Sequence, residues 1–397
     1  MTTMLTDTGI GYGLFDADEH YYEPEDAVTR HLEREFRHAF QWIDVRGRKT
    51  LLINNKLLTL IPNPTYDPVG RPGALIDYFR AQNHDGRSLK EILGDVQPVQ
   101  PEYQSSAARI AAMDAQGVEF SWLLPSLGLG LEEMLKETPD ALYGVFRAYN
   151  RWLAEDWGYA TERYQTAPLL SLVDPAEAEA DLAGLIEAGA RLVVLRPAPV
   201  SGPGFSRSVA DPRHDRVFAM AAEAGVVVSF HAAESGYGKY SAEWGEGATF
   251  GGHKSSPFEE ILAVHIERPT FDTIAACIAH GLFDRVPGLR VATLELGAGW
   301  VPELLRRLRI TYGKMPQAFV RDPIDAFHEH VWVTPFYEDN VAELCAAIGT
   351  DHVLFGSDWP HPEGVALPAE WVSEVAVLGE ADRRKVMRDN LRALAGR

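Results

Sequence analysis

Short apolar runs alternate with longer amphipathic stretches along most of the chain. Several runs are almost continuously apolar, which favours parallel strands that are covered on both faces. Eight such runs are predicted to be strands: LFDAD (14–18), VEFSWLLP (118–125), PLLSLVD (168–174), RLVVLRP (191–197), VVVSFH (226–231), RVATLEL (290–296), VWVTPF (331–336) and HVLFGSD (352–358).

The stretches between these runs carry apolar residues at helical spacing and have recognisable helix ends. The segment 175–189 follows Asp174 and begins with Pro175, a typical helix start, and it closes on Gly189. Strands that alternate with helices predict parallel βαβ units, and a count of eight favours a closed (β/α)8 TIM barrel. An open Rossmann-like sheet is the alternative, but no G-x-G-x-x-G follows any predicted strand.

Two long insertions interrupt this alternation. Residues 27–104 contain RGRKTLLINN, which is typical of a hairpin, and a Pro/Gly-rich stretch. Residues 232–267 follow the fifth strand and are rich in Gly, Ser and aromatic residues. Neither insertion resembles an independent domain. We therefore predict a single domain over residues 1–397, with the 27–104 insertion as a cap or lid over the active site.

Acidic and histidine residues stand at the ends of four predicted strands. The first strand delivers Asp18 and His20, the fifth His231, the sixth Glu295 and the eighth Asp358. In a β/α barrel these ends meet at one mouth, where carboxylate oxygens and imidazole nitrogens would form a divalent-metal site. We predict Asp18, His20, His231 and Asp358 as metal ligands, and Asp358 and Glu295 as catalytic. Taken singly, each residue could instead be a helix cap or a core histidine.

Further residues are candidates for substrate contacts. Arg196 follows the fourth strand and could bind a substrate carboxylate, or could form a structural ion pair. His361 and Trp300 are predicted to line the substrate site, although packing explains Trp300 equally well. Glu23 is either a partner of His20 or a cap for the next turn, and His253 is a candidate lid residue.

Composition limits the classes of partner. Asp+Glu 57 against Lys+Arg 37 gives a net charge of −20, so binding to nucleic acid or to an anionic membrane surface is not expected. The two cysteines lie in apolar helical stretches and are predicted to be buried thiols. No apolar run approaches the length of a membrane span, and we find no signal peptide. The expected location is the cytoplasm.

The motifs FDADEHYYEP, VVVSFHAAE, FDRVPGLRVATLELGAGWVP and FGSDWPHPEG, in this order, resemble the amidohydrolase superfamily. They are most similar to its amidohydrolase 2 branch, which includes aminocarboxymuconate-semialdehyde decarboxylase. The resemblance implies metal ligands at Asp18, His20, His231 and Asp358. It also implies two departures, because the family more often has histidine at the positions of Asp18 and Glu295. An imidazole donates protons readily near neutral pH, whereas a carboxylate needs a raised pKa.

From these features we expect one divalent metal ion, zinc first, with manganese or iron as alternatives. Our main functional hypothesis is a metal-dependent hydrolase of a small organic substrate. In it the cation activates water, Asp358 accepts the proton, and Glu295 orients substrate or relays a proton. The alternative is a non-oxidative decarboxylase of an aromatic or unsaturated acid, and a third is a non-catalytic barrel. Oligomeric state is left open, with a homodimer as one candidate.

Overall fold

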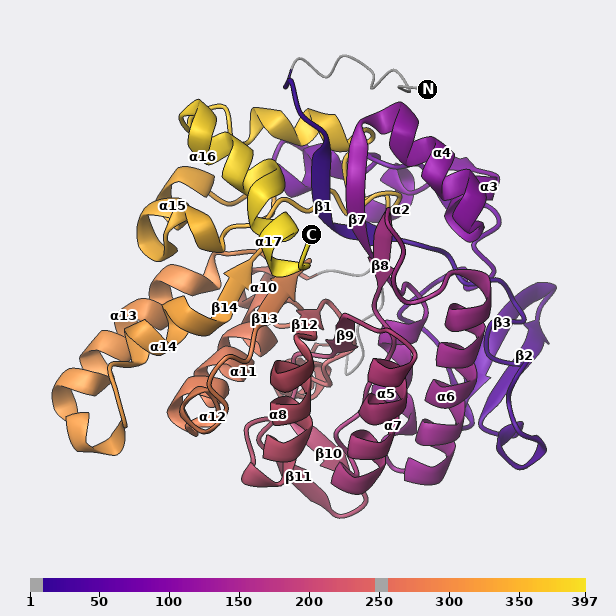
Figure 1. Cartoon of the computed structure of the whole chain (residues 1–397). Coiled ribbons are helices and arrows are strands. Elements are labelled where there is room, and N and C mark those ends of the chain that lie inside the picture. Colours follow the sequence, from indigo (N-terminus) through magenta and orange to yellow (C-terminus); the bar gives the residue numbers. More distant parts are fainter. Residues whose placement is uncertain (1–9, 247–255) are drawn as a thin grey trace.

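The computed structural model describes residues 10–246 and 256–397, and its main strands form two parallel sheets (Figure 1). One sheet contains β1 (Leu14–His20), β7 (Val118–Leu124) and β8 (Tyr164–Thr166). The other contains, in spatial order, β14 (Val331–Val333), β13 (Val291–Leu294), β12 (Val227–His231) and β9 (Leu192–Leu195). All neighbouring strands in both sheets are parallel. Every residue of β1, β9, β12 and β13 is buried, as the apolar runs predict.

Backbone bridges join the two sheets at both of their edges. On one side, Leu169 pairs in parallel with Val194 of β9. On the other side, the segment 353–359 pairs with β14 through Val353 and with β1 through Trp359. These bridges connect the two sheets by parallel pairing. The carboxyl ends of β1 and β12, and the segments that follow β13 and β14, therefore all lie on the same side of the strands.

Two predicted strands differ from the regular pattern. Residues 168–174 and 352–358 contain no named strand and make only isolated bridges, while β8 lies just before the first of them. Pro168 has no N–H to donate to a ladder. In the second segment the backbone turns into the left-handed region at Asp358, with φ of +55°. Both irregularities fall where the chain leaves the sheet.

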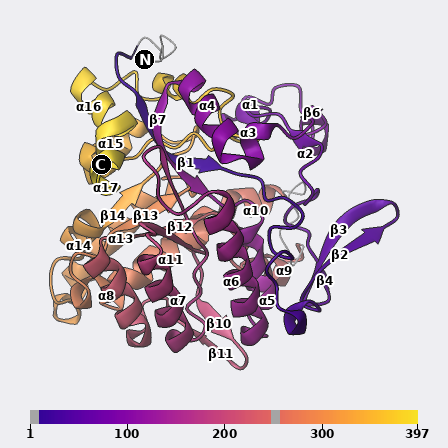
Figure 2. The same ribbon diagram turned by 45° about the vertical axis from the view of Figure 1, so that its right-hand side comes forward.

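Helices follow the strands and cover them from outside (Figures 1 and 2). The start signal at Asp174 is confirmed, because its Oδ1 accepts the N–H of Ala176 at 2.9 Å. The main helices are α4 (Ser106–Gln116), α5 (Leu131–Leu135), α6 (Pro139–Asp156), α7 (Pro175–Glu187), α8 (Asp215–Ala224), α11 (Glu267–Ala279), α12 (Leu282–Arg285), α13 (Trp300–Lys314), α14 (Pro323–His330), α15 (Val341–Ile348), α16 (Glu380–Arg384) and α17 (Asn390–Leu394).

The 27–104 insertion contains small elements of its own. They are the hairpin strands β2 (Phe40–Val45) and β3 (Arg48–Ile53), then β4 (Lys56–Leu57), β5 (Val69–Gly70), α1 (Ile76–Phe79), α2 (Leu89–Ile92), β6 (Val96–Gln97) and α3 (Pro101–Gln104). The hairpin projects from the body of the molecule in Figure 2. Elsewhere the insertion is tied down, because Leu75 N donates to Pro362 O at 2.8 Å and Arg80 pairs with Glu374 at 2.5 Å. The first of these anchors, Pro362, lies four residues after Asp358.

The second insertion contains α9 (Gly238–Glu243) and α10 (Pro257–Leu262). His253 lies outside the described residues. An additional hairpin that the pattern did not predict, β10 (Val200–Gly202) and β11 (Phe205–Arg207), follows β9.

Cys277 and Cys345 are buried free thiols, as predicted. Among the described residues, no helix combines the length and the apolar character that a membrane span requires.

A fully buried ion pair fixes the outer side of β1. Glu19 and Arg109 are both 0% exposed, and Arg109 Nη1 lies 3.1 Å from Glu19 Oε2. Arg109 also donates to the backbone carbonyl of His20 and covers the ring of Trp359 at 4.6 Å. The pair therefore holds β1 and the segment 353–359 together, on the side facing away from the other residues at the end of β1.

We predict that Glu19→Ala lowers the free energy of unfolding by about 3–5 kcal/mol, because it leaves the buried guanidinium uncompensated. Asp95→Ala is the matched control: Asp95 pairs with Arg71 but its side chain is 62% exposed. Its loss should cost no more than about 1 kcal/mol. Urea unfolding followed by tryptophan fluorescence measures both. Equal costs for the two variants would show that the buried pair does not stabilise the fold.

Candidate metal centre and active site

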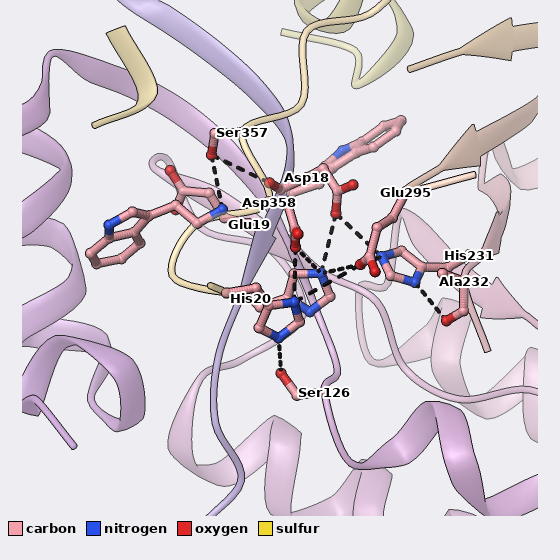
Figure 3. Close-up of polar contacts among 12 residues, drawn as sticks. Asp18, Glu19, His20, Ser126, His231, Ala232, Glu295, Ser357 and Asp358 are labelled. Carbon is pink, nitrogen blue, oxygen red and sulfur yellow. Dashed lines mark hydrogen bonds and ion pairs between the residues drawn. The ribbon is translucent and has the colours of Figure 1, made fainter. Parts of the chain in front are cut away.

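Side chains from three strand ends meet at one point, as the sequence predicts (Figure 3). Asp18 and His20 are two residues apart on β1 and point to the same side. His231 is the last residue of β12, and its Nε2 lies 3.3 Å from Asp18 Oδ1. Glu295 follows β13, and Asp358 directly precedes Trp359, the residue that bridges to β1. Within this group, His20 Nε2 lies 3.3 Å from Asp18 Oδ1, 3.2 Å from Glu295 Oε2 and 3.4 Å from Asp358 Oδ1.

The two imidazoles are oriented by backbone carbonyl groups. His20 Nδ1 lies 3.1 Å from Pro125 O, and His231 Nδ1 lies 3.0 Å from Ala232 O. A carbonyl oxygen only accepts hydrogen bonds, so Nδ1 carries the hydrogen in both rings. Each Nε2 therefore points its lone pair towards the carboxylates. Because lone pairs that face each other repel, a proton or a cation must lie between these Nε2 atoms and the carboxylate oxygen atoms.

The distances fit a cation better than a proton. A charge-assisted N–H···O bond is typically about 2.7–2.9 Å long, whereas the contacts of His20 Nε2 are 3.2–3.4 Å. Two ligands that each lie about 2.1 Å from one metal ion are roughly 3.0–3.4 Å apart. In addition, His20 Nε2, Glu295 Oε2 and both carboxylate oxygens of Asp358 are buried without a hydrogen-bond partner among the described residues. The residues present therefore fit a divalent cation.

The pKa shifts of these residues also indicate that the cluster needs a compensating positive charge. Burial alone would lower the pKa of His20, but the carboxylates of Asp18 and Glu295 raise it to about 10. Burial alone would raise the pKa of Asp18, but His231 and His20 lower it to about 2. Burial and the charges of Glu295 and Glu363 hold the pKa of Asp358 well above its usual value. A cation would favour the ionised form of all the carboxylates.

Two features of the backbone determine where the carboxylates of Asp18, Glu295 and Asp358 point. Glu295 and Asp358 have φ of +51° and +55°, a region that costs a residue with a side chain roughly 1–3 kcal/mol. Asp16, which is fully buried, holds the neighbouring backbone: its Oδ1 accepts from Asp18 N at 3.1 Å and from Ser357 N at 3.0 Å. Asp16 thereby fixes the position of Asp18 relative to Asp358. The sequence analysis missed this role of Asp16.

His361 lies beside the cluster, as predicted. Its ring stacks on His20, with centroids 3.8 Å apart. Its Nδ1 lies 2.8 Å from Asp358 Oδ1, and its Nε2 lies 2.8 Å from Ser126 Oγ. Ser126 donates its own hydrogen to Tyr21 O at 2.9 Å, so His361 Nε2 is the donor to Ser126. Burial and the charges of His20 and His231 hold the pKa of His361 well below its usual value.

Aromatic rings continue the stack away from the cluster. Tyr22 lies parallel to His361, with centroids 5.6 Å apart, and Tyr66 stacks on Tyr22 at 4.4 Å. Tyr66 belongs to the 27–104 insertion. The column of rings Tyr66, Tyr22, His361 and His20 therefore connects the insertion to the candidate metal centre.

Glu23 supports the loop that carries Ser126. Its carboxylate accepts the backbone N–H groups of Ser126, Leu127 and Gly128 at 3.0, 2.9 and 3.2 Å, together with the hydroxyl of Tyr149 at 2.6 Å. These contacts match neither of the two roles considered for Glu23, because His20 Nδ1 contacts Pro125 O and the loop that Glu23 caps follows β7, not Glu23 itself. Ser126 was missed, because one serine in a loop gives no signal in the sequence.

Two other candidates lie in structural contacts. Arg196 Nη1 lies 2.5 Å from Glu133 Oε2 and donates to Glu234 O at 3.1 Å, which matches the ion-pair alternative. Trp300 is buried at the start of α13, and its indole N–H donates to Gly297 O at 2.9 Å. These contacts match the packing alternative for Trp300. Neither residue contacts the cluster in the described interactions.

Comparisons with known proteins identify a family for this chain. A family model described as Amidohydrolase matches residues 76–396. An amidohydrolase from Mycobacterium avium subsp. paratuberculosis is 40% identical, and the two structures match over 97% of this chain and 100% of that one, with a TM-score of 0.90.

Two further relatives are decarboxylases. Gamma-resorcylate decarboxylase from Rhodococcus jostii is 34% identical over 144 residues, which cover 34% of this chain and only 40% of that enzyme. The structure of a dihydroxybenzoic acid decarboxylase from Polaromonas sp., with bound manganese and the inhibitor 2-nitroresorcinol, is similar in fold. It has a TM-score of 0.57 and 17% identity, covering 83% of this chain and 97% of that one.

We predict that a saturating divalent cation stabilises the protein through this cluster. A ligand present at 100 times its Kd adds about 2.7 kcal/mol to the free energy of unfolding. Thermal unfolding of chelator-treated protein, with and without Mn²⁺ or Zn²⁺, measures the effect. His231→Asn should lose most of the stabilisation, whereas His280→Asn, at an exposed histidine that bonds Ser208, should keep it. Equal stabilisation of both variants would place the cation elsewhere.

Proposed function

The chain belongs to the amidohydrolase family, and within that family we propose that it is a metal-dependent decarboxylase of an aromatic hydroxy acid. The observation that carries the proposal is the similarity to gamma-resorcylate decarboxylases, 30–34% identical over 137–144 residues. The match spans about two fifths of those enzymes, so the reaction of the whole chain is our inference. It replaces hydrolysis, our first hypothesis from the sequence, with the alternative.

We also infer that the two sheets form one closed (β/α)8 barrel. The bridges at Leu169 and along 353–359 support closure at both edges, and the family supports the same fold. We treat the chain as one domain whose 27–104 insertion caps the barrel mouth. Its anchor on Pro362, four residues after Asp358, supports this role.

Asp18, His20, His231 and Asp358 are the residues that we assign to one divalent cation. Carboxylate ligands favour manganese, whereas imidazole ligands favour zinc or iron. Because the Polaromonas relative contains manganese and this cluster is rich in carboxylates, we propose manganese ahead of zinc. A divalent cation bound here would stabilise negative charge on the substrate oxygens next to the bond that breaks.

In the proposed reaction, the bond between the ring carbon and its carboxylate breaks and CO₂ leaves. The electron pair that stays on the ring carbon then takes up a proton. We assign delivery of this proton to Asp358, whose Oδ1 lies in the cluster, 3.4 Å from His20 Nε2 and 2.8 Å from His361 Nδ1. His361 holds this carboxyl in place, because its Nδ1 lies 2.8 Å from Asp358 Oδ1 while its Nε2 donates to Ser126 Oγ at 2.8 Å. The stacked rings of Tyr22 and His361 suit a flat aromatic substrate.

Hydrolysis is the second candidate, and one residue favours it. Glu295 stands where the resemblance implies histidine in the decarboxylases, and a carboxylate beside a cation suits activation of water. The two reactions differ in what they consume: hydrolysis adds the oxygen of water to the product, whereas decarboxylation does not.

The test is turnover of gamma-resorcylate and a panel of hydroxybenzoates by the manganese-loaded protein in H₂¹⁸O and in D₂O. We expect release of CO₂, one deuterium on the ring, and no ¹⁸O in the aromatic product. Asp358→Asn should lower the rate about 10²–10⁴-fold, while the exposed Asp95→Asn control leaves it unchanged. Incorporation of ¹⁸O without CO₂ on screening aromatic esters and amides would support the hydrolase instead.

A further inference from the structure

Glu295 lies among the candidate ligands rather than behind them. It directly follows β13, and its side chain is only 13% exposed. Its N–H donates to Thr334 Oγ1 at 3.3 Å, and its φ is +51°. The left-handed backbone sets the direction of the side chain, which reaches the two imidazoles.

The distances place Glu295 and Asp18 equivalently with respect to the histidines. Asp18 Oδ1 lies 3.3 Å from the Nε2 atoms of both His20 and His231. Glu295 Oε2 lies 3.2 Å from the same two atoms. These four atoms all lie within 4.8 Å of one another. If a cation lies next to the two imidazole nitrogens, Glu295 Oε2 is as well placed to bind it as Asp18 Oδ1.

We propose that Glu295 is a direct ligand of the cation, which gives the site three carboxylates and two imidazoles. This inference rests on the metal centre of the proposed function and goes beyond it, because Glu295 had been expected to act on water or substrate. A carboxylate that acts only on bound water would lie one hydrogen bond further out, about 2.7 Å beyond the water oxygen. Glu295 Oε2 instead sits at the spacing that separates two ligands of one ion. It also has no hydrogen-bond partner among the described residues.

The additional carboxylate changes the charge of the centre. Asp18, Glu295 and Asp358, when ionised, carry three negative charges against the two positive charges of the cation. Oxygen ligands of this kind favour Mn²⁺, while a site with fewer carboxylates and more imidazoles suits Zn²⁺. The proposal therefore predicts that position 295 controls which metal the protein prefers.

The test compares Glu295→Gln with Glu363→Gln in the full-length, chelator-treated protein. Both substitutions remove one carboxylate near His20, because Glu363 interacts electrostatically with Glu295 and His20. The side chains whose ligand atoms lie within 4.8 Å of one another form two groups: Asp18, His20, His231 and Glu295, and His20, Glu295, Asp358 and His361. Glu363 does not belong to either group. Titration calorimetry with MnCl₂ and ZnCl₂ measures the affinities, and circular dichroism checks that each variant is folded.

We expect Glu295→Gln to raise the Kd for Mn²⁺ by about 100-fold or more, above the effect typical of residues that only support ligands. Glu363→Gln should raise it by less than about 10-fold. Glu295→His should raise the ratio of Zn²⁺ affinity to Mn²⁺ affinity above that of the wild type. Equal losses in Glu295→Gln and Glu363→Gln would overturn the ligand role, because charge alone would then explain the change.

A crystal structure of the manganese-loaded wild type gives an independent measurement if the variants do not fold. Anomalous scattering locates the ion, and Glu295 Oε2 should lie about 2.0–2.2 Å from it. A distance above about 3.5 Å with a water between would overturn the inference while leaving the metal centre intact. Failure of the wild type to bind either ion would overturn the metal centre itself, and this inference with it.

Discussion

Negative charge concentrated in a buried space is the constraint on which this structure depends. The carboxylates of Asp18 and Asp358 are 2% exposed, and both face the fully buried imidazole of His20. Taking ionised groups out of water costs several kcal/mol each unless opposite charge compensates them. In the cation-free protein the imidazoles supply part of that charge, as the raised pKa of His20 indicates. A divalent cation would supply it more completely, because its two positive charges would lie beside several of these groups at once.

The surrounding structure keeps these groups together against their mutual repulsion. Asp16 bonds the backbone of β1 to that of Ser357, while the Glu19–Arg109 pair holds the other side of the same strand. The Glu23 carboxylate accepts hydrogen bonds from three N–H groups of the loop after β7, and this loop orients His20 through the carbonyl of Pro125. None of these residues needs to touch a substrate. Their common effect is that the ligands need little rearrangement when a cation binds.

The sequence predicted that Asp18, His20, His231 and Asp358 lie close together because their positions follow from a general rule. Parallel strands place their carboxyl ends at one edge, so Asp18, His231 and Asp358 meet there whatever the connecting segments do. Ser126 and Asp16 could not be predicted in the same way. Ser126 depends on the course of a loop, and Asp16 acts through a backbone contact with a segment that lies more than 300 residues away in sequence. Position 295 was predicted to belong to the site, but its role depends on distances of a few tenths of an ångström.

The exchange of histidine for glutamate at position 295 connects the metal to the reaction. A carboxylate there adds negative charge to the centre, which weakens the attraction for an anionic substrate and makes the bound cation a weaker electrophile. It also removes an imidazole from the position that the resemblance assigns to one in the decarboxylases. In this chain another imidazole lies close by, because His361 stacks on His20 and contacts Asp358. In this chain two residues therefore take the place of that one histidine. Glu295 adds an oxygen ligand, as we propose, and His361 keeps a ring nitrogen beside Asp358.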